Sequence, residues 1–192
     1  MSDDFLIRRA LVGDAPTLGR IQVTSWRESH SGILPADRLA KLDPAELGAQ
    51  FSARLRNRDE PTATFVAVVA GRGAVGFGIC GPARRGPRGH HGEIHALYVL
   101  GAVHGKGIGR ALMTRMAGWL QSRALEPAFV GVLRDNSAAR GFYEHLGGRH
   151  IGEKPVRWQN LDLVEALYGW ENLDALLGLD MTDVIPLFPP KR

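Results

Sequence analysis

Apolar and polar residues along the first third of the chain predict one strand followed by helices. Residues 5–11 alternate well enough for a strand. Residues 13–29 have the spacing of an amphipathic helix, with Asp14 placed to cap its N-terminus. A second helical region is predicted at 32–57, and it is interrupted by two prolines because proline cannot continue a helix. The apolar residues on or near one face of the first helix are Leu18, Ile21, Val23 and Trp26, and the two prolines are Pro35 and Pro44.

Strands and helices alternate along the rest of the chain. Two apolar runs that meet around Gly71 and Gly73 predict a hairpin. We therefore predict a mixed α/β sheet in which only the two strands on either side of the long helix need to be parallel. The predicted elements are strands at 62–71, 74–80 and 93–99, a helix ending near residue 124, a strand at 127–133, a helix at 137–147 and antiparallel strands at 149–154 and 156–170.

Length and composition indicate an ordinary globular protein. The 192 residues suit one domain, given about 150 residues per domain. Hydrophobic residues make up 44% of the chain and charged residues 23%. No apolar run approaches the ~20 residues of a membrane span, and the acidic start is unlike a signal peptide. We expect a cytoplasmic protein with no membrane partner.

The charge balance of the chain is basic. The formal net charge is +4, and much of the excess lies in the loop that carries Arg84, Arg85 and Arg88. One short basic loop without aromatic partners favours a solvated loop over a nucleic-acid interface, so we do not expect a nucleic-acid partner.

The single cysteine, Cys80, lies in a strand-like run and is expected to be a buried small hydrophobe.

A glycine-rich turn opens the long helix and predicts a site for a phosphate-bearing ligand. Gly105, Gly107 and Gly109 leave backbone N–H groups free of side-chain bulk where the helix begins. A Walker loop is excluded because Lys106 is followed by glycine instead of Ser or Thr. A dinucleotide fingerprint is disfavoured because Leu112 occupies the position of its third small residue.

Residues 104–109 resemble the pyrophosphate loop of the GNAT superfamily of N-acetyltransferases, with His104 where that pattern has Gln or Arg. Residues 135–148 are similar to the family segment in which an Asn begins a helix, a Phe-Tyr pair follows and a Leu-Gly ends it. The matching positions are Asn136, Ala139, Phe142, Tyr143, Leu146 and Gly147. The resemblance is close over residues 93–152 and loose over the whole chain. It implies an α/β GNAT acyltransferase fold, with a mixed, mostly antiparallel sheet, splayed central parallel strands and flanking helices.

The resemblance also implies an activity and a cofactor site. It implies transfer of an acetyl group from acetyl-CoA to a primary amine of a small molecule or protein, by direct attack in a ternary complex that releases CoA. A CoA-binding regulatory module without an acceptor of its own is the alternative. The implied cofactor-binding residues are the main chain of Leu97, Tyr98 and Val99, the turn residues His104, Gly105, Lys106, Gly107, Ile108, Gly109 and Arg110, and the side chains of Asn136 and Tyr143.

Acid and base candidates follow from the same comparison. Tyr143 is the candidate general acid, because a phenol of pKa near 10 can protonate a thiolate of pKa near 8.5 with little penalty. Glu93 is the candidate base, with a pKa expected to be raised, and His95 on the same face of the strand is the second candidate. A water chain is a third. Trp26, His30 and His95 are the candidate acceptor-binding residues.

Two further features leave alternatives open. His90, His91, Glu93 and His95 invite a metal site, but no other ligand stands at a recognised spacing, so we expect no metal. Residues 1–171 are expected to form the acetyltransferase domain. The apolar tail at 172–192 is expected to pack on that domain or on a partner subunit, and the second case would make the protein a homodimer.

Overall fold

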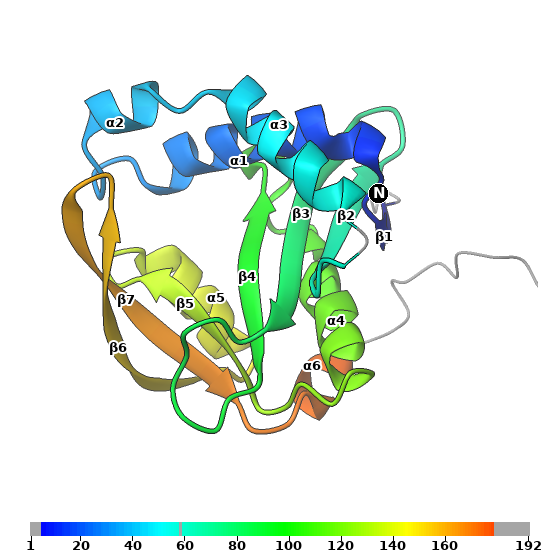
Figure 1. The fold of residues 1–192 in the computed structure, drawn as a ribbon, viewed down its shortest axis with the longest axis vertical. Coiled ribbons are helices and arrows are strands. Elements are labelled where there is room, and N and C mark those ends of the chain that lie inside the picture. Colours follow the sequence, from blue (N-terminus) through cyan, green and yellow to red (C-terminus); the bar gives the residue numbers. More distant parts are fainter. Residues whose placement is uncertain (1–4, 58, 179–192) are drawn as a thin grey trace, which may run out of the picture.

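The protein is built around one seven-stranded sheet with helices on both faces (Figure 1). The computed structural model describes residues 5–57 and 59–178. All neighbouring strands are antiparallel except β4 and β5, which confirms the predicted mixed sheet with one parallel pair. In spatial order the strands are β1 (Phe5–Arg9), β2 (Ala63–Val69), β3 (Gly73–Pro82), β4 (Gly92–Val99), β5 (Ala128–Leu133), β7 (Leu161–Trp170) and β6 (Arg149–Trp158).

The helices divide between the two faces and bury two apolar clusters. One cluster joins α1 and α3 to residues of β2, β3 and β4. The larger cluster lies on the opposite face, under α4, α5 and α6. No helix among residues 5–57 and 59–178 is long and apolar enough to cross a membrane. The helices are α1 (Ala15–Ser29), α2 (Ala36–Ala40), α3 (Pro44–Arg56), α4 (Ile108–Gln121), α5 (Ser137–His145) and α6 (Asp174–Leu177), with 3-10 turns η1 (Val12–Asp14) and η2 (Gly101–Val103).

The parallel strands β4 and β5 pair over only three residues and then separate. The register pairs Gly92, Glu93 and Ile94 with residues 128–130, and no pair follows. A β-bulge lies at the same point, because Cys80 of β3 pairs with Ile94 while the preceding residue pairs with Ala96. The remaining halves of β4 and β5 therefore form a split in the sheet (Figure 1). This is the splay that the resemblance implied.

The predicted break between the last two strands was wrong. The turn falls at Gln159 and Asn160, whose φ angles are 44° and 66°, and two successive positive φ values are typical of a tight hairpin turn. Pro155, where the sequence suggested the break, instead lies inside β6 and pairs with Val164. It is tolerated because β6 is an edge strand, so the missing N–H leaves no gap in the hydrogen-bond ladder.

Asp14 occupies the N-cap position of α1, but its side chain does not cap that helix. The carboxylate accepts hydrogen bonds from the Leu11 N–H at 2.7 Å and from the Arg8 guanidinium at 2.7 and 2.9 Å. The hydrogen bond from Arg8 is the main reason that the pKa of Asp14 lies below its ordinary value. The predicted capping interaction is therefore replaced by one that fixes β1 against the start of α1.

The chain continues beyond β7 into α6, which packs on the domain. Leu173 and Leu176 are fully buried in the larger cluster, and the Thr114 hydroxyl of α4 donates a hydrogen bond of 3.0 Å to the Leu176 carbonyl. The rest of the predicted apolar tail lies outside the described residues, including Val184, Ile185, Leu187 and Phe188.

Candidate active site

Backbone polar groups of β4 face the split. The Leu100 N–H donates to the Val75 carbonyl of β3 at 3.0 Å. Because main-chain groups alternate sides along a strand, those of Val99 and Leu97 point away from β3 and into the split. The Val99 carbonyl lies 2.8 Å from His104 Nε2. The main chain of β4 can therefore pair with an extended ligand as an added strand would.

The glycine-rich turn after β4 presents its N–H groups at the start of α4. Gly105 and Gly107 have φ angles of 75° and 81°, and Gly107 is the N-cap residue. A Cβ atom at either position would meet nothing within 4 Å, so the turn is open there. The N–H groups of Ile108, Gly109 and Arg110 in the first turn have no intrahelical partner. The turn has the donors and the positive dipole end that a pyrophosphate needs.

The side chains around this turn connect it to β4 and α5. His104 contacts Val99, and Arg110 Nη2 lies 3.1 Å from His145 Nε2 on α5. A Cβ on Gly109 would lie 3.2 Å from the Phe142 ring, so α4 and α5 approach closely at this glycine. The exposed Lys106 lies at the tip of the turn. The structure thus places residues 104–110 together beside α5.

Asn136 and Tyr143 lie at the start and on the buried face of α5. Asn136 is 7% exposed, and its side-chain oxygen accepts a hydrogen bond of 3.1 Å from the Ala139 N–H, which is the N-cap interaction expected from the sequence. Tyr143 is 6% exposed and its ring packs against Phe142 and Trp170. Burial, and secondarily the neighbouring Tyr98, raises the pKa of the Tyr143 phenol well above its ordinary value. The sequence analysis expected Tyr143 to donate a proton with little penalty because it assumed the pKa of an ordinary phenol. The raised pKa makes that donation more costly.

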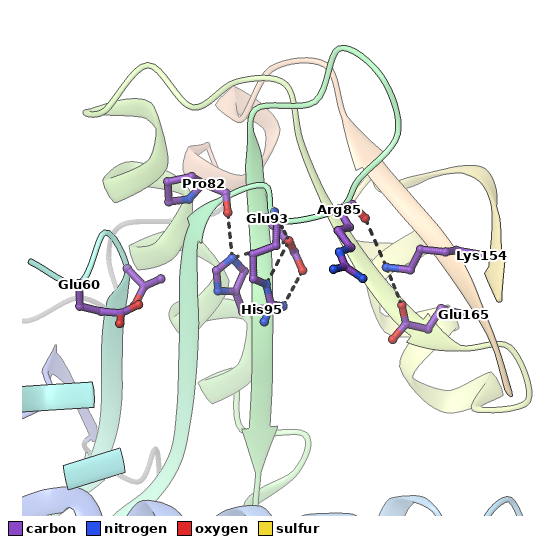
Figure 2. A network of polar contacts seen from close by, with 9 residues as sticks. Glu60, Pro82, Arg85, Glu93, His95, Lys154 and Glu165 are labelled. Carbon is purple, nitrogen blue, oxygen red and sulfur yellow. Dashed lines mark hydrogen bonds and ion pairs between the residues drawn. The ribbon is translucent and has the colours of Figure 1, made fainter. Parts of the chain in front are cut away.

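Glu93 is held in a tight ion pair with the basic loop (Figure 2). Its carboxylate accepts hydrogen bonds from the Arg84 guanidinium at 2.7 Å and from the Arg84 N–H at 2.9 Å. Burial acts to raise the pKa of Glu93, but the hydrogen bonds from Arg84 and the nearby charges outweigh it, and the pKa lies below its ordinary value. The expected raised pKa was wrong, because the sequence did not reveal that Arg84 folds back onto this carboxylate.

His95 lies next to Glu93 and the Pro82 carbonyl (Figure 2). Its Nε2 is 3.1 Å from the Pro82 carbonyl and 3.7 Å from the Glu93 carboxylate. Both neighbours are acceptors, so the proton is assigned to Nε2 and the lone pair to Nδ1. Nδ1 is buried without a hydrogen-bond partner among the described residues. Burial is the main reason that the pKa of His95 lies below its ordinary value.

Trp26 of α1 and His30, the C-cap residue of that helix, lie on the face of the sheet that carries Glu93 and His95. The Trp26 ring centroid lies 5.0 Å from that of His30 and 5.2 Å from that of Trp158 at the tip of the β6–β7 hairpin. Tyr98 of β4 is a neighbour of Trp26. Burial raises the pKa of the Tyr98 phenol, and the Trp26 indole offsets part of that rise. Burial lowers the pKa of His30. We call Trp26, Tyr98 and Trp158 the aromatic wall.

Two members of the site were missed by the sequence analysis. Arg84 was assigned to a solvated loop, and nothing in its local sequence marks the ion pair with Glu93. Trp158 was not singled out, although alternation along β6 places it on one face with Lys154. Within the described part of the chain, no group of three or more His, Cys, Asp and Glu side chains could hold a metal ion.

Comparison with known proteins agrees with this architecture. The sequence profile of the Acetyltransferase (GNAT) family matches residues 23–148. The chain is also 29% identical over 173 residues to the uncharacterized N-acetyltransferase YuaI of Bacillus subtilis, covering 90% of this chain and 96% of YuaI. The chain therefore belongs to the acetyltransferase (GNAT) family. Its enzymatic class is that of the N-acetyltransferases.

Solved structures share the fold at lower sequence identity. The PaiA N-acetyltransferase of Thermoplasma acidophilum, solved in complex with coenzyme A, has a TM-score of 0.65 and 18% identity, covering 84% of this chain and 97% of that one. YncA of Salmonella typhimurium, a putative acetyltransferase solved with acetyl-CoA, has a TM-score of 0.63 and 19% identity, covering 88% and 94%. At these identities the likeness shows the fold alone.

Proposed function

We propose that this protein transfers the acetyl group of acetyl-CoA to a primary amine by direct attack in a ternary complex. The observation that carries the proposal is the split between β4 and β5, with Leu97 and Val99 facing it and the glycine-rich turn at its end. The coenzyme A and acetyl-CoA present in two structural relatives support the choice of cosubstrate. Cys80 supports direct attack, because it is buried under α4 and burial raises its pKa to about 12, so it is not suited to carry an acetyl group.

The turn and β4 would hold acetyl-CoA through main-chain groups. The N–H groups of residues 105–110 would bind the pyrophosphate, and Leu97 and Val99 would pair with the pantetheine arm. The Val99 carbonyl already accepts from the Ser25 hydroxyl at 3.5 Å and lies 2.8 Å from His104 Nε2, so at Val99 the pairing would use the N–H group. Asn136 caps α5 with its oxygen, which leaves its amide N–H groups to bind a pantetheine carbonyl.

Tyr143 is the candidate acid for the departing thiolate. The amine nitrogen forms a bond to the thioester carbon, the carbon–sulfur bond breaks, and the sulfur takes a proton from the Tyr143 hydroxyl. The raised pKa keeps the phenol protonated before the reaction but makes full transfer to a free thiolate unfavourable. We infer that the Tyr143 hydroxyl stabilises the departing sulfur by donating a hydrogen bond as its negative charge develops, and that any proton the phenol gives to the thiolate is replaced from solvent.

His95 is a better candidate than Glu93 for the group that deprotonates the amine. Glu93 already accepts hydrogen bonds from Arg84, and its lowered pKa makes it a weak base. His95 presents a lone pair on Nδ1 while Pro82 and Glu93 keep the proton on Nε2. Because Nδ1 is buried, the amine proton would reach it through water, and Glu93 would stabilise the imidazolium that forms.

The test is a panel of primary amines incubated with acetyl-CoA, with the released thiol as the readout. Transfer to at least one amine, with a stoichiometric acetylated product in the mass spectrum, is the expected result. Tight binding of CoA without thiol release for any amine would contradict the proposal and favour the CoA-binding regulatory module.

A further inference from the structure

Glu165 of β7 is a carboxylate on the face of the sheet that carries the aromatic wall. Glu165 pairs with Leu133 of β5, so the two side chains share a face. The next residue, Ala166, packs in the cluster under α4 and α5 on the opposite face. Glu165 therefore faces the same side as α1, although it was not among the residues singled out from the sequence.

A glycine allows this carboxylate to reach over β5 to the split. A Cβ built on Gly131 would lie 2.6 Å from Glu165 Oε2, closer than real atoms approach. Gly131 is the first residue of β5 beyond the segment that pairs with β4. The negative charge of Glu165 also acts across the split, where it is a third influence on Tyr98, after burial and Trp26, and raises the pKa of that phenol.

Lys154 of β6 partly neutralises this carboxylate. Its Nζ lies 3.2 Å from Glu165 Oε2 and 3.5 Å from the Arg85 carbonyl. Figure 2 shows both side chains extending from the hairpin toward β4. The Glu165 side chain is 27% exposed and the Lys154 side chain is 33% exposed. The ion pair is therefore open to solvent and to a competing cation.

The aromatic wall adds a second kind of contact on the same face. Trp26 and Trp158 lie 5.2 Å apart and join the first helix to the tip of the hairpin, with Tyr98 beside them. Aromatic faces bind apolar groups and attract cations.

The geometry points to Glu165 as the residue that binds the acceptor ammonium, and to an acceptor that carries an apolar or aromatic body and no carboxylate beside the amine. This rests on the proposed function. Glu165 would attract the ammonium in exchange for part of its pairing with Lys154, while the body of the acceptor lies against the aromatic wall. A carboxylate next to the amine would be repelled by Glu165, which distinguishes simple amines from amino acids.

The experiment compares tyramine with L-tyrosine, which share a ring and an amine and differ in the α-carboxylate. Binding is measured by calorimetry on the full chain saturated with CoA, so that affinity is read without acetyl transfer. We expect tyramine to bind about 10- to 100-fold more tightly than L-tyrosine, the range for one charge-assisted hydrogen bond. Glu165→Gln should weaken tyramine binding by a similar factor, leave the affinity for CoA unchanged and reduce the preference over L-tyrosine.

Two further variants separate binding from a merely structural role. Lys154→Met removes the competing cation, so tyramine should bind more tightly, by about threefold or more. Glu153→Gln is the matched control, because Glu153 pairs with Ala166 and so faces the opposite side of the hairpin; it should leave both amines unaffected. If Lys154→Met weakened binding as Glu165→Gln does, the ion pair would be structural and the inference wrong.

Equal affinity of the wild-type protein for tyramine and L-tyrosine would also overturn the inference, as would tighter binding of L-tyrosine. Thiol release from acetyl-CoA is measured separately. Selective tyramine binding without thiol release would contradict the proposed function and leave the amine site standing. Acetyl transfer to amines that does not depend on Glu165 would support the proposed function and contradict the assignment of Glu165 to the amine site.

Discussion

Replacing Gly107 should remove CoA binding without unfolding the protein. The φ angle of 81° at this N-cap position is one that side chains disfavour, and the space around it is open, so a substitution is strained by the backbone alone and not by a clash. Holding alanine in this conformation costs about 1–2 kcal/mol, and a β-branched residue is a genuine outlier there. A variant turn must either keep this strain or change the direction of the N–H groups that open α4.

We therefore expect Gly107→Ala to lower the melting temperature by about 2–8 °C and to weaken CoA binding by about 5- to 30-fold. Gly107→Val should show no measurable CoA binding, with an unchanged circular dichroism spectrum. Its Cβ and methyl groups would also occupy the open side of the turn, where the pyrophosphate must approach.

Gly118→Ala in the same helix is the matched control. A Cβ there would lie 3.6 Å from Leu177, an ordinary contact, and the position has no positive φ. It should stabilise the protein by about 0.5–1 kcal/mol and leave CoA affinity unchanged. Calorimetric titration with CoA measures all three variants. A dissociation constant for Gly107→Val within about threefold of the wild type would refute the assignment of this turn to the pyrophosphate.

The other expectations concern the chemistry around the split. Tyr143→Phe should lower kcat by about ten- to a thousand-fold with little change in CoA affinity; an unchanged kcat would remove the phenol from the reaction. Arg84→Met removes the guanidinium that pairs with the buried Glu93 carboxylate but keeps the backbone N–H bond, and it should cost about 1–3 kcal/mol of stability in urea unfolding at neutral pH. Because the folded pKa of Glu93 is lowered, that stabilisation is present above its unfolded pKa and is lost as pH falls through the folded value, so the difference from wild type should shrink in acid. The pKa of His95 is also lowered, so kcat/KM should stay level through its ordinary value of 6.5 and fall only at lower pH; in His95→Gln that acidic limb should disappear. Gly131→Ala should displace the flexible Glu165 carboxylate and raise KM for the amine, with KM for acetyl-CoA unchanged.

Local sequence was enough to predict the elements that build the proposed cofactor site. The glycines before α4 and the Asn that begins α5 act through local backbone geometry, and the structure places both as expected. The buried position of Cys80 likewise follows from its apolar strand. These features depend on neighbours a few residues away, so their patterns are readable along the chain.

The features that were missed depend on residues that are distant in sequence or on a fine balance of interactions. Arg84 reaches Glu93 only because the loop folds back over β4, and this contact reverses the expected direction of the Glu93 pKa. Glu165 reaches the split only because Gly131 on another strand has no side chain. The β6–β7 turn was misplaced because proline was taken to end a strand, whereas an edge strand tolerates it.

The kinetic mechanism, ternary complex or covalent intermediate, tests the central claim of direct acetyl transfer most directly. Initial rates of thiol release are measured over a grid of acetyl-CoA and amine concentrations, using the best amine of the panel. Direct attack in a ternary complex predicts double-reciprocal lines that intersect, and no acetyl group on the protein when acetyl-CoA is added without amine. Parallel lines together with an acetylated protein in the mass spectrum would show a covalent intermediate and contradict the account.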